Sequence, residues 1–154
     1  ELGDVNYGRS NAVSFGRKVA RHRSIYLPII RNALPEVLRV FDFAEPSLIV
    51  GRRQITTVPT QALYLLNDPF VLEQTEAIAQ RLIDSTTDEG ERIDLAYTLA
   101  LGRPATTLER ERSLALLHDI GAGLNGKNDQ ERQGVAWATL AQSLIASAEF
   151  RYLN

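Results

Sequence analysis

The chain has 154 residues, 44% of them hydrophobic and 23% charged, which is typical of a globular domain and excludes a disordered chain. The net charge of -2 argues against a nucleic-acid partner, and the absence of Cys excludes disulfides, iron–sulfur ligation and c-type haem attachment. No apolar run approaches the roughly 20 residues of a membrane-spanning helix, and no signal peptide is visible.

The N-terminal part is basic and the rest is acidic. Residues 1–53 carry nine Arg and Lys against five Asp and Glu, whereas residues 54–154 carry eight against fourteen. Fifteen of the seventeen basic residues are Arg, whose planar guanidinium binds carboxylates through paired hydrogen bonds. This distribution favours pairing between the two parts as readily as it favours ligand binding.

Residues 1–22 show no helical or strand period and contain three Gly, which predicts an irregular entry segment or the end of an upstream part. The apolar side chains in this segment are expected to be buried. We therefore expect the segment to pack across the helices of its own chain or on a second copy, as a homodimer. Because the chain starts at Glu1 and contains no Met, we interpret it as a piece of a longer protein.

Residues 23–154 are expected to form one helical domain. Residues 24–30 are apolar, and Pro28 restricts the residue before it to an extended conformation, which predicts an extended segment or an edge strand. A short helix is expected over 35–41, because Pro suits the first turn of a helix. A long connection over 42–57 follows.

From Pro59 onward the apolar spacing is helical. The spacing and the helix-ending residues predict helices over 59–66, 69–85, 88–101, 106–120 and 130–147. Asp68 is expected to cap the second of these, Thr106 and Glu109 to form a capping box, and Gly102 to end the third. The fold class is therefore mostly α: a bundle of about five helices behind an irregular Arg-rich segment, with one short strand at most.

A dense group of polar residues lies between Arg23 and Asn67. The guanidinium groups match carboxylates and sulfates, so they suit an anion clamp, but they equally suit ties between loops and carboxylates or helix ends. Gln and Asn could also recognise sugar hydroxyls. We favour the structural interpretation, in which Thr57 or its neighbour caps a helix, Gln61 holds the preceding loop and Asn67 ends the helix. The candidate residues are Arg23, Arg31, Asp42, Arg52, Arg53, Thr57, Gln61 and Asn67.

No catalytic, cofactor or metal motif is recognisable. His22 and His118 are the only His residues and are too far apart in sequence to suggest metal-ligand spacing. Acidic residues such as Glu109 lie in the first turns of helices, where the helix dipole accounts for them. Trp137 and Tyr97 follow helical core spacing, which favours packing over a sugar platform.

Several phrases carry a resemblance to a known family. They are Arg23-Ser24-Ile25-Tyr26, Phe41-Asp42, Arg52-Arg53, Thr57 to Leu63 in the form TVPTQAL, and Leu101-Gly102-Arg103-Pro104. In order and spacing, residues 20–154 resemble the planctomycete-specific C-terminal domain of unknown function 1553. The resemblance implies an exported, periplasmic or cell-surface, multidomain protein whose upstream part carries a cytochrome-c-like module. It implies haem c only for that absent module, and it implies no reaction.

Two functions follow from this sequence. The first is a non-catalytic structural or interaction domain whose partners are the upstream domains of its own chain. The alternative is part of an enzyme or binding module that acts on polysaccharide or sulfated glycan. A cleft that joins the Arg group to a carboxylate of raised pKa would favour the alternative.

We predict that the purified chain binds neither transition metal nor haem, because it contains no Cys, no Met and two isolated His residues. Elemental analysis together with an absorption spectrum checks this. A stoichiometric metal or a Soret band would contradict it.

Overall fold

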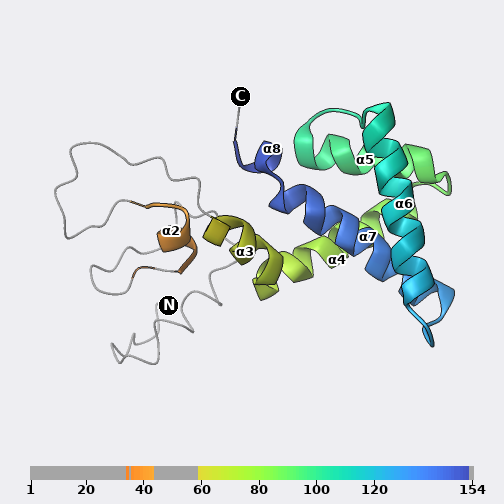
Figure 1. Cartoon of the computed structure of the whole chain (residues 1–154), viewed down its shortest axis with the longest axis horizontal. Coiled ribbons are helices and arrows are strands. Elements are labelled where there is room, and N and C mark those ends of the chain that lie inside the picture. The colour runs from red at the N-terminus through yellow and green to blue at the C-terminus, as the bar shows by residue number, and fades with distance from the viewer. Residues whose placement is uncertain (1–33, 35, 44–58, 153–154) are drawn as a thin grey trace, which may run out of the picture. The chain divides into compact units, whose positions relative to one another are not determined.

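The regular structure in the part of the chain that the computed structural model describes, residues 34, 36–43 and 59–152, is entirely helical (Figure 1). The mostly α fold is therefore confirmed, whereas the strand predicted over 24–30 lies outside the described residues. None of the described helices combines the length and apolar character needed to cross a membrane. The helices are α2 (Glu36–Val40), α3 (Pro59–Asn67), α4 (Pro69–Ser85), α5 (Glu89–Leu101), α6 (Thr107–Gly123), α7 (Asp129–Ala146) and α8 (Ala148–Arg151).

The chain divides into two compact units, Glu1–Gln61 and Ala62–Asn154. Helix α7 is the central element of the second unit, since α4, α5, α6 and α8 all pack against it. Figure 1 shows α4 and α7 running side by side. The hydrophobic core of this unit therefore lies around α7.

The core is built from one face of each of the helices α4, α5, α6 and α7. Trp137 and Leu140 of α7 are each 2% exposed, and they meet Leu82 of α4 and Ile93 of α5, which are fully buried. Tyr97 of α5 and Leu117 of α6 belong to the same cluster. The expected packing role of Trp137 and Tyr97 is what the structure shows.

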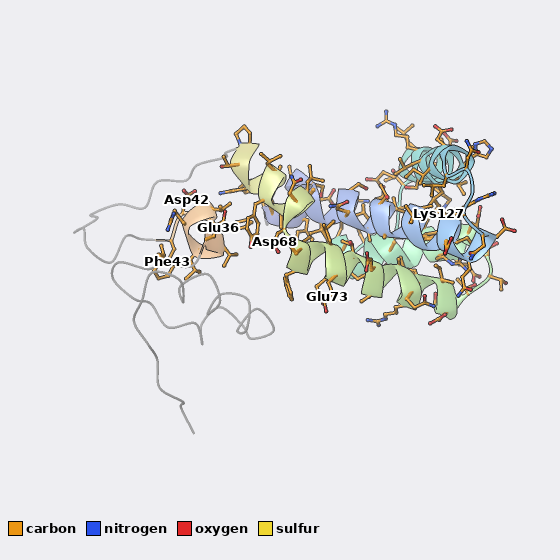
Figure 2. All side chains as sticks on the ribbon, turned by 90° about the horizontal axis from the view of Figure 1, so that it is seen from below. Glu36, Asp42, Phe43, Asp68, Glu73 and Lys127 are labelled. Atoms are coloured by element: carbon orange, nitrogen blue, oxygen red, sulfur yellow. The ribbon has the colours of Figure 1, made fainter. Side chains whose placement is uncertain are left out.

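Local hydrogen bonds define the helix ends where the sequence predicts them. Asp68, at the junction of α3 and α4, accepts from the backbone N–H groups of Phe70 and Val71 (Figure 2). Thr106 and Glu109 form the predicted capping box at the start of α6. Gly102 ends α5 with φ 74°, a left-handed conformation that Gly adopts without steric cost.

Helix bounds lie within one residue of prediction except at the end of α6, and α7 differs in how it starts and ends. Helix α6 continues past residue 120 to Gly123, because the cost of about 1 kcal/mol for a helical Gly does not stop a helix that packs against α7. Helix α7 ends at Ala146, since the Ser147 hydroxyl accepts from the N–H of Phe150 and starts the separate helix α8. A capping box of Asn128 and Glu131, which was not predicted, starts α7.

We predict that Leu82→Ala lowers the free energy of unfolding by about 2–5 kcal/mol, because it leaves a cavity at a fully buried position. Urea denaturation measures this. Leu108→Ala is the control, since Leu108 is 53% exposed and its truncation should cost less than about 0.5 kcal/mol. Equal destabilisation by the two substitutions would contradict the assigned core.

Candidate functional site

Three of the eight candidate polar residues lie in the described part of the chain. Asn67 donates from Nδ2 to the Leu63 carbonyl at 2.7 Å, at the end of α3. Gln61 donates from Nε2 to Oδ2 of Asp42 at 3.4 Å, although the two are 19 residues apart. The structure thus brings Asp42 and Gln61 together. Arg23, Arg31, Arg52, Arg53 and Thr57 lie outside the described residues.

Asp42 terminates helix α2 (Figure 2). Its φ of 54° is left-handed, a conformation that Asp tolerates better than most residues other than Gly. The Phe43 N–H donates to the Leu38 carbonyl at 2.8 Å, and the Asp42 N–H donates to the Arg39 carbonyl at 3.3 Å. These two bonds form a Schellman motif, which satisfies carbonyl groups that the helix end leaves open. Asp42 is therefore a helix-ending residue.

The densest ionic cluster of the second unit centres on Arg103, in the turn between α5 and α6. Its guanidinium makes two hydrogen bonds to Glu109, both 2.8 Å, and two to Glu149, at 2.7 and 2.8 Å. The Cζ atom of Arg103 also lies 5.8 Å from the ring centre of Tyr97. Because Glu149 belongs to α8, this cluster ties the α5–α6 turn to the C-terminal helix.

The carboxylates of this cluster are held in their charged form. The Arg103 hydrogen bonds, with those from the backbone and hydroxyl of Thr106, lower the pKa of Glu109 to about 2. Arg103 also lowers the pKa of Glu149, and the two carboxylates together raise the pKa of Arg103. A carboxylic acid that donates a proton near neutral pH needs a raised pKa. Because the pKa values of these carboxylates are lowered, the arrangement suits a permanent structural ion pair.

A second Arg caps helix α4. Arg92 is 5% exposed, and its Nε atom donates to the Thr86 carbonyl at 3.2 Å. Its Nη2 atom donates to the carbonyls of Thr86 and Ile83. The guanidinium lies over Trp137, with Cζ 5.0 Å from the ring centre. A cation at this position suits the carbonyl groups and the negative dipole end of α4.

Sequence reasoning missed Arg92, Arg103 and Glu149 as paired residues. A local signal existed for Arg92, because it lies four residues before the buried Ala96 and so shares its helix face. Glu109 was assigned to the capping box and to the helix dipole, and the structure adds its pairing with Arg103. Nothing local links Arg103 to Glu149, which is 46 residues away.

In the ranges that the structure describes, no group of three or more His, Cys, Asp or Glu side chains is arranged to hold a metal ion.

Arg110 of α6 pairs with Asp94 of α5 at 2.5 Å, and this hydrogen bond lowers the pKa of Asp94. The charged groups gathered here therefore join helices to one another.

Comparison with known proteins gives a family match. The family model PSD1, described as a protein of unknown function (DUF1553), matches residues 6–117. This match includes Asp42, Gln61, Arg92 and the Arg103–Glu109 pair, and it ends before Glu149. No curated protein and no solved structure matches the chain.

We predict that Arg103→Ala releases helix α8 while the melting temperature falls by only a few degrees, because the ion pairs are partly exposed. The amide chemical shifts of residues 148–151, measured by NMR, should move toward coil values. Arg112→Ala is the control, since Arg112 is an exposed residue of α6. Native α8 shifts in Arg103→Ala would show that α8 is held by other contacts.

The Arg103 cluster should also respond to acid. The folded state holds the pKa of Glu109 at about 2, below the ordinary value of 4.5, so the folded state binds fewer protons than the unfolded chain. This stabilisation is complete above about pH 5 and is lost as the pH falls toward 2. An acid titration followed by NMR should show the amide shift of Thr106, whose N–H donates to Glu109, moving in that window, and in Arg103→Ala the movement should occur at higher pH.

Proposed function

We propose that this chain, which belongs to the PSD1 family of proteins of unknown function (DUF1553), is a non-catalytic structural or interaction domain of a larger exported bacterial protein. On this proposal its partners are the upstream domains of the same protein. Haem c then belongs to an upstream cytochrome-c-like module rather than to this chain. The family resemblance based on the sequence phrases is confirmed by the match over residues 6–117.

The observation that carries the proposal is how the charged side chains of the second unit are used. Arg103 is shared between Glu109 and Glu149, Arg92 binds the carbonyls at the end of α4, and Arg110 binds Asp94. Each of these bonds joins two segments of the fold. An enzyme site would instead direct some of these groups toward a substrate.

The direction of the pKa shifts supports a non-catalytic role. Cleavage of a glycosidic bond uses two carboxyl groups, one of which must be protonated when the substrate binds. Hydrogen bonds from Arg side chains lower the pKa of Asp94, Glu109 and Glu149. A lowered pKa makes these three groups poorly suited to supply the acid of a glycan-cleaving pair near neutral pH.

Exposed apolar side chains support the interaction role. Leu63 and Leu66 of α3 are 61% and 45% exposed, and Phe70 in the first turn of α4 is 37% exposed. Neighbouring exposed apolar side chains are typical of surfaces that meet another protein. A domain of a multidomain protein has such a surface where it contacts its neighbours.

We predict that any glycan-cleaving activity of the larger protein proposed above is unchanged when Asp94, Glu109 and Glu149 are replaced one at a time by their amides. Release of reducing ends and of sulfate from neutral and sulfated polysaccharides measures this.

The separately produced upstream part should bind the 154-residue chain in a 1:1 complex, measured by calorimetry. Leu63→Ser together with Leu66→Ser should weaken that complex at least about tenfold, a loss of about 1.4 kcal/mol.

Leu99→Ser is the matched control for the binding experiment, because Leu99 is also an exposed Leu, 41% accessible, but lies on α5. A loss of activity by about a thousandfold or more in one amide variant that still melts like the natural protein would overturn the non-catalytic role. Failure of the two parts to associate would overturn the interaction role.

A further inference from the structure

The turn that joins α6 to α7 contains Asn125 followed by Gly126, an Asn–Gly pair that occurs nowhere else in the chain (Figure 1). Asn is one of the chemically labile residues of proteins, because the main-chain nitrogen of the next residue can attack its side-chain amide. A following Gly favours this attack, since it has no Cβ to obstruct the nitrogen. The local structure then decides whether the reaction occurs in the folded chain.

Both reacting groups of this pair are open to water. Asn125 is exposed, and its side chain forms no hydrogen bond with the described residues. The turn is closed by the Asn125 N–H, which donates to the Gly123 carbonyl at 3.1 Å, whereas the Gly126 N–H has no acceptor in the described part of the chain. A Cβ built on Gly126 would meet no atom within 4 Å. Solvent base can therefore reach the nitrogen, and nothing in the fold blocks its approach to the amide.

The other two Asn residues in the described ranges are held by hydrogen bonds. Asn67 donates from Nδ2 to the Leu63 carbonyl at 2.7 Å, and the N–H of the next residue donates to the Tyr64 carbonyl at 2.8 Å. The Oδ1 atom of Asn128 accepts from the Glu131 N–H at 2.8 Å, in the cap of α7. Each of these two must lose a hydrogen bond before it can react, whereas the Asn of the α6–α7 turn loses none.

We propose that Asn125 is a site of spontaneous deamidation in the folded protein. The Gly126 nitrogen gives its proton to solvent base and bonds to Cγ of Asn125, while the bond from Cγ to Nδ2 breaks and ammonia leaves. Water then opens the resulting five-membered succinimide ring on one side or the other of its nitrogen. The products are aspartate and isoaspartate at position 125, and the net reaction consumes one water and releases one ammonia.

Either product adds a carboxylate three residues before Asn128, the residue that caps α7. The aspartate form leaves the main chain unchanged. The isoaspartate form inserts one CH2 group into the main chain of the turn between α6 and α7, which pack against each other. The modification therefore changes the charge of the turn and, in the second form, the length of the connection between two packed helices.

The test is incubation of the complete 154-residue chain at neutral and at mildly alkaline pH, followed by trypsin digestion and peptide mass analysis. Cleavage after Lys and Arg places the three Asn residues in separate peptides, 54–81, 113–127 and 128–132. Peptide 113–127 should gain the mass difference between NH2 and OH, faster at the higher pH, and part of the product should accept a methyl group from an isoaspartate-specific methyltransferase. The other two peptides should change at least about tenfold more slowly, a factor that one lost hydrogen bond can supply.

Incubation in urea separates the effect of the fold from the effect of the Asn–Gly sequence. Because the folded turn offers no hydrogen bond that protects either reacting group, peptide 113–127 should change in the native chain at a rate within about tenfold of its rate in urea. A native rate lower than that would show that the fold protects Asn125, and it would overturn the proposal. So would equal rates for all three peptides in the native chain.

Two substitutions test the reacting pair itself. Asn125→Gln should abolish the mass change in the peptide, because the longer side chain would have to close a larger ring. Gly126→Ala should slow it at least about tenfold, since the added Cβ obstructs the attacking nitrogen. Gly134→Ala is the matched control, because it makes the same change at an unobstructed Gly of α7, and it should leave the rate unaltered. Thermal unfolding verifies that all three variants fold, and an unchanged rate in Gly126→Ala contradicts the assigned nucleophile.

Discussion

The second unit depends on how one buried cation is satisfied. Arg92 is 5% exposed, and a guanidinium removed from water to that extent is tolerated only when its hydrogen bonds are made. The carbonyls of Ile83 and Thr86 and the face of Trp137 meet that need. Because these partners belong to the end of α4 and the middle of α7, satisfying Arg92 fixes where α4 stops, where α5 starts and how both meet α7.

Core packing follows from that arrangement. Leu82 lies one residue before Ile83, Ile93 lies one residue after Arg92, and both are fully buried beside Trp137. The hydrogen bonds of Arg92 fix how α4 and α5 are oriented against α7, whereas the burial of these apolar side chains contributes most of the stability. Loss of the hydrogen bonds alone would leave the buried charge of Arg92 unpaired. Loss of Arg92 would leave the apolar cluster without a group that defines its orientation.

Arg103 lies at the surface, where water screens charges more strongly than it does at the buried Arg92. Its side chain is 35% exposed, so its four hydrogen bonds to Glu109 and Glu149 hold a geometry more than they stabilise the whole fold. That geometry places α8 beside the α5–α6 turn.

The sequence by itself determined the elements whose causes are local. Asp68, Thr106 with Glu109, and Gly102 act within three or four residues of themselves, so the helix ends they produce are readable along the chain. The same holds for the mostly α fold and for the helical core spacing of Trp137, because a helix repeats every 3.6 residues whatever surrounds it.

Only the tertiary structure decided which polar groups meet. Of the candidate residues, Asp42 and Gln61 come together across 19 positions, while Arg103 and Glu149 meet across 46, and no local rule specifies either distance. The continuation of α6 through Gly121 was likewise decided by packing on α7, which outweighs the weak helix propensity of Gly. Partner choice depends on how helices pack, and packing is a property of the folded chain rather than of any segment.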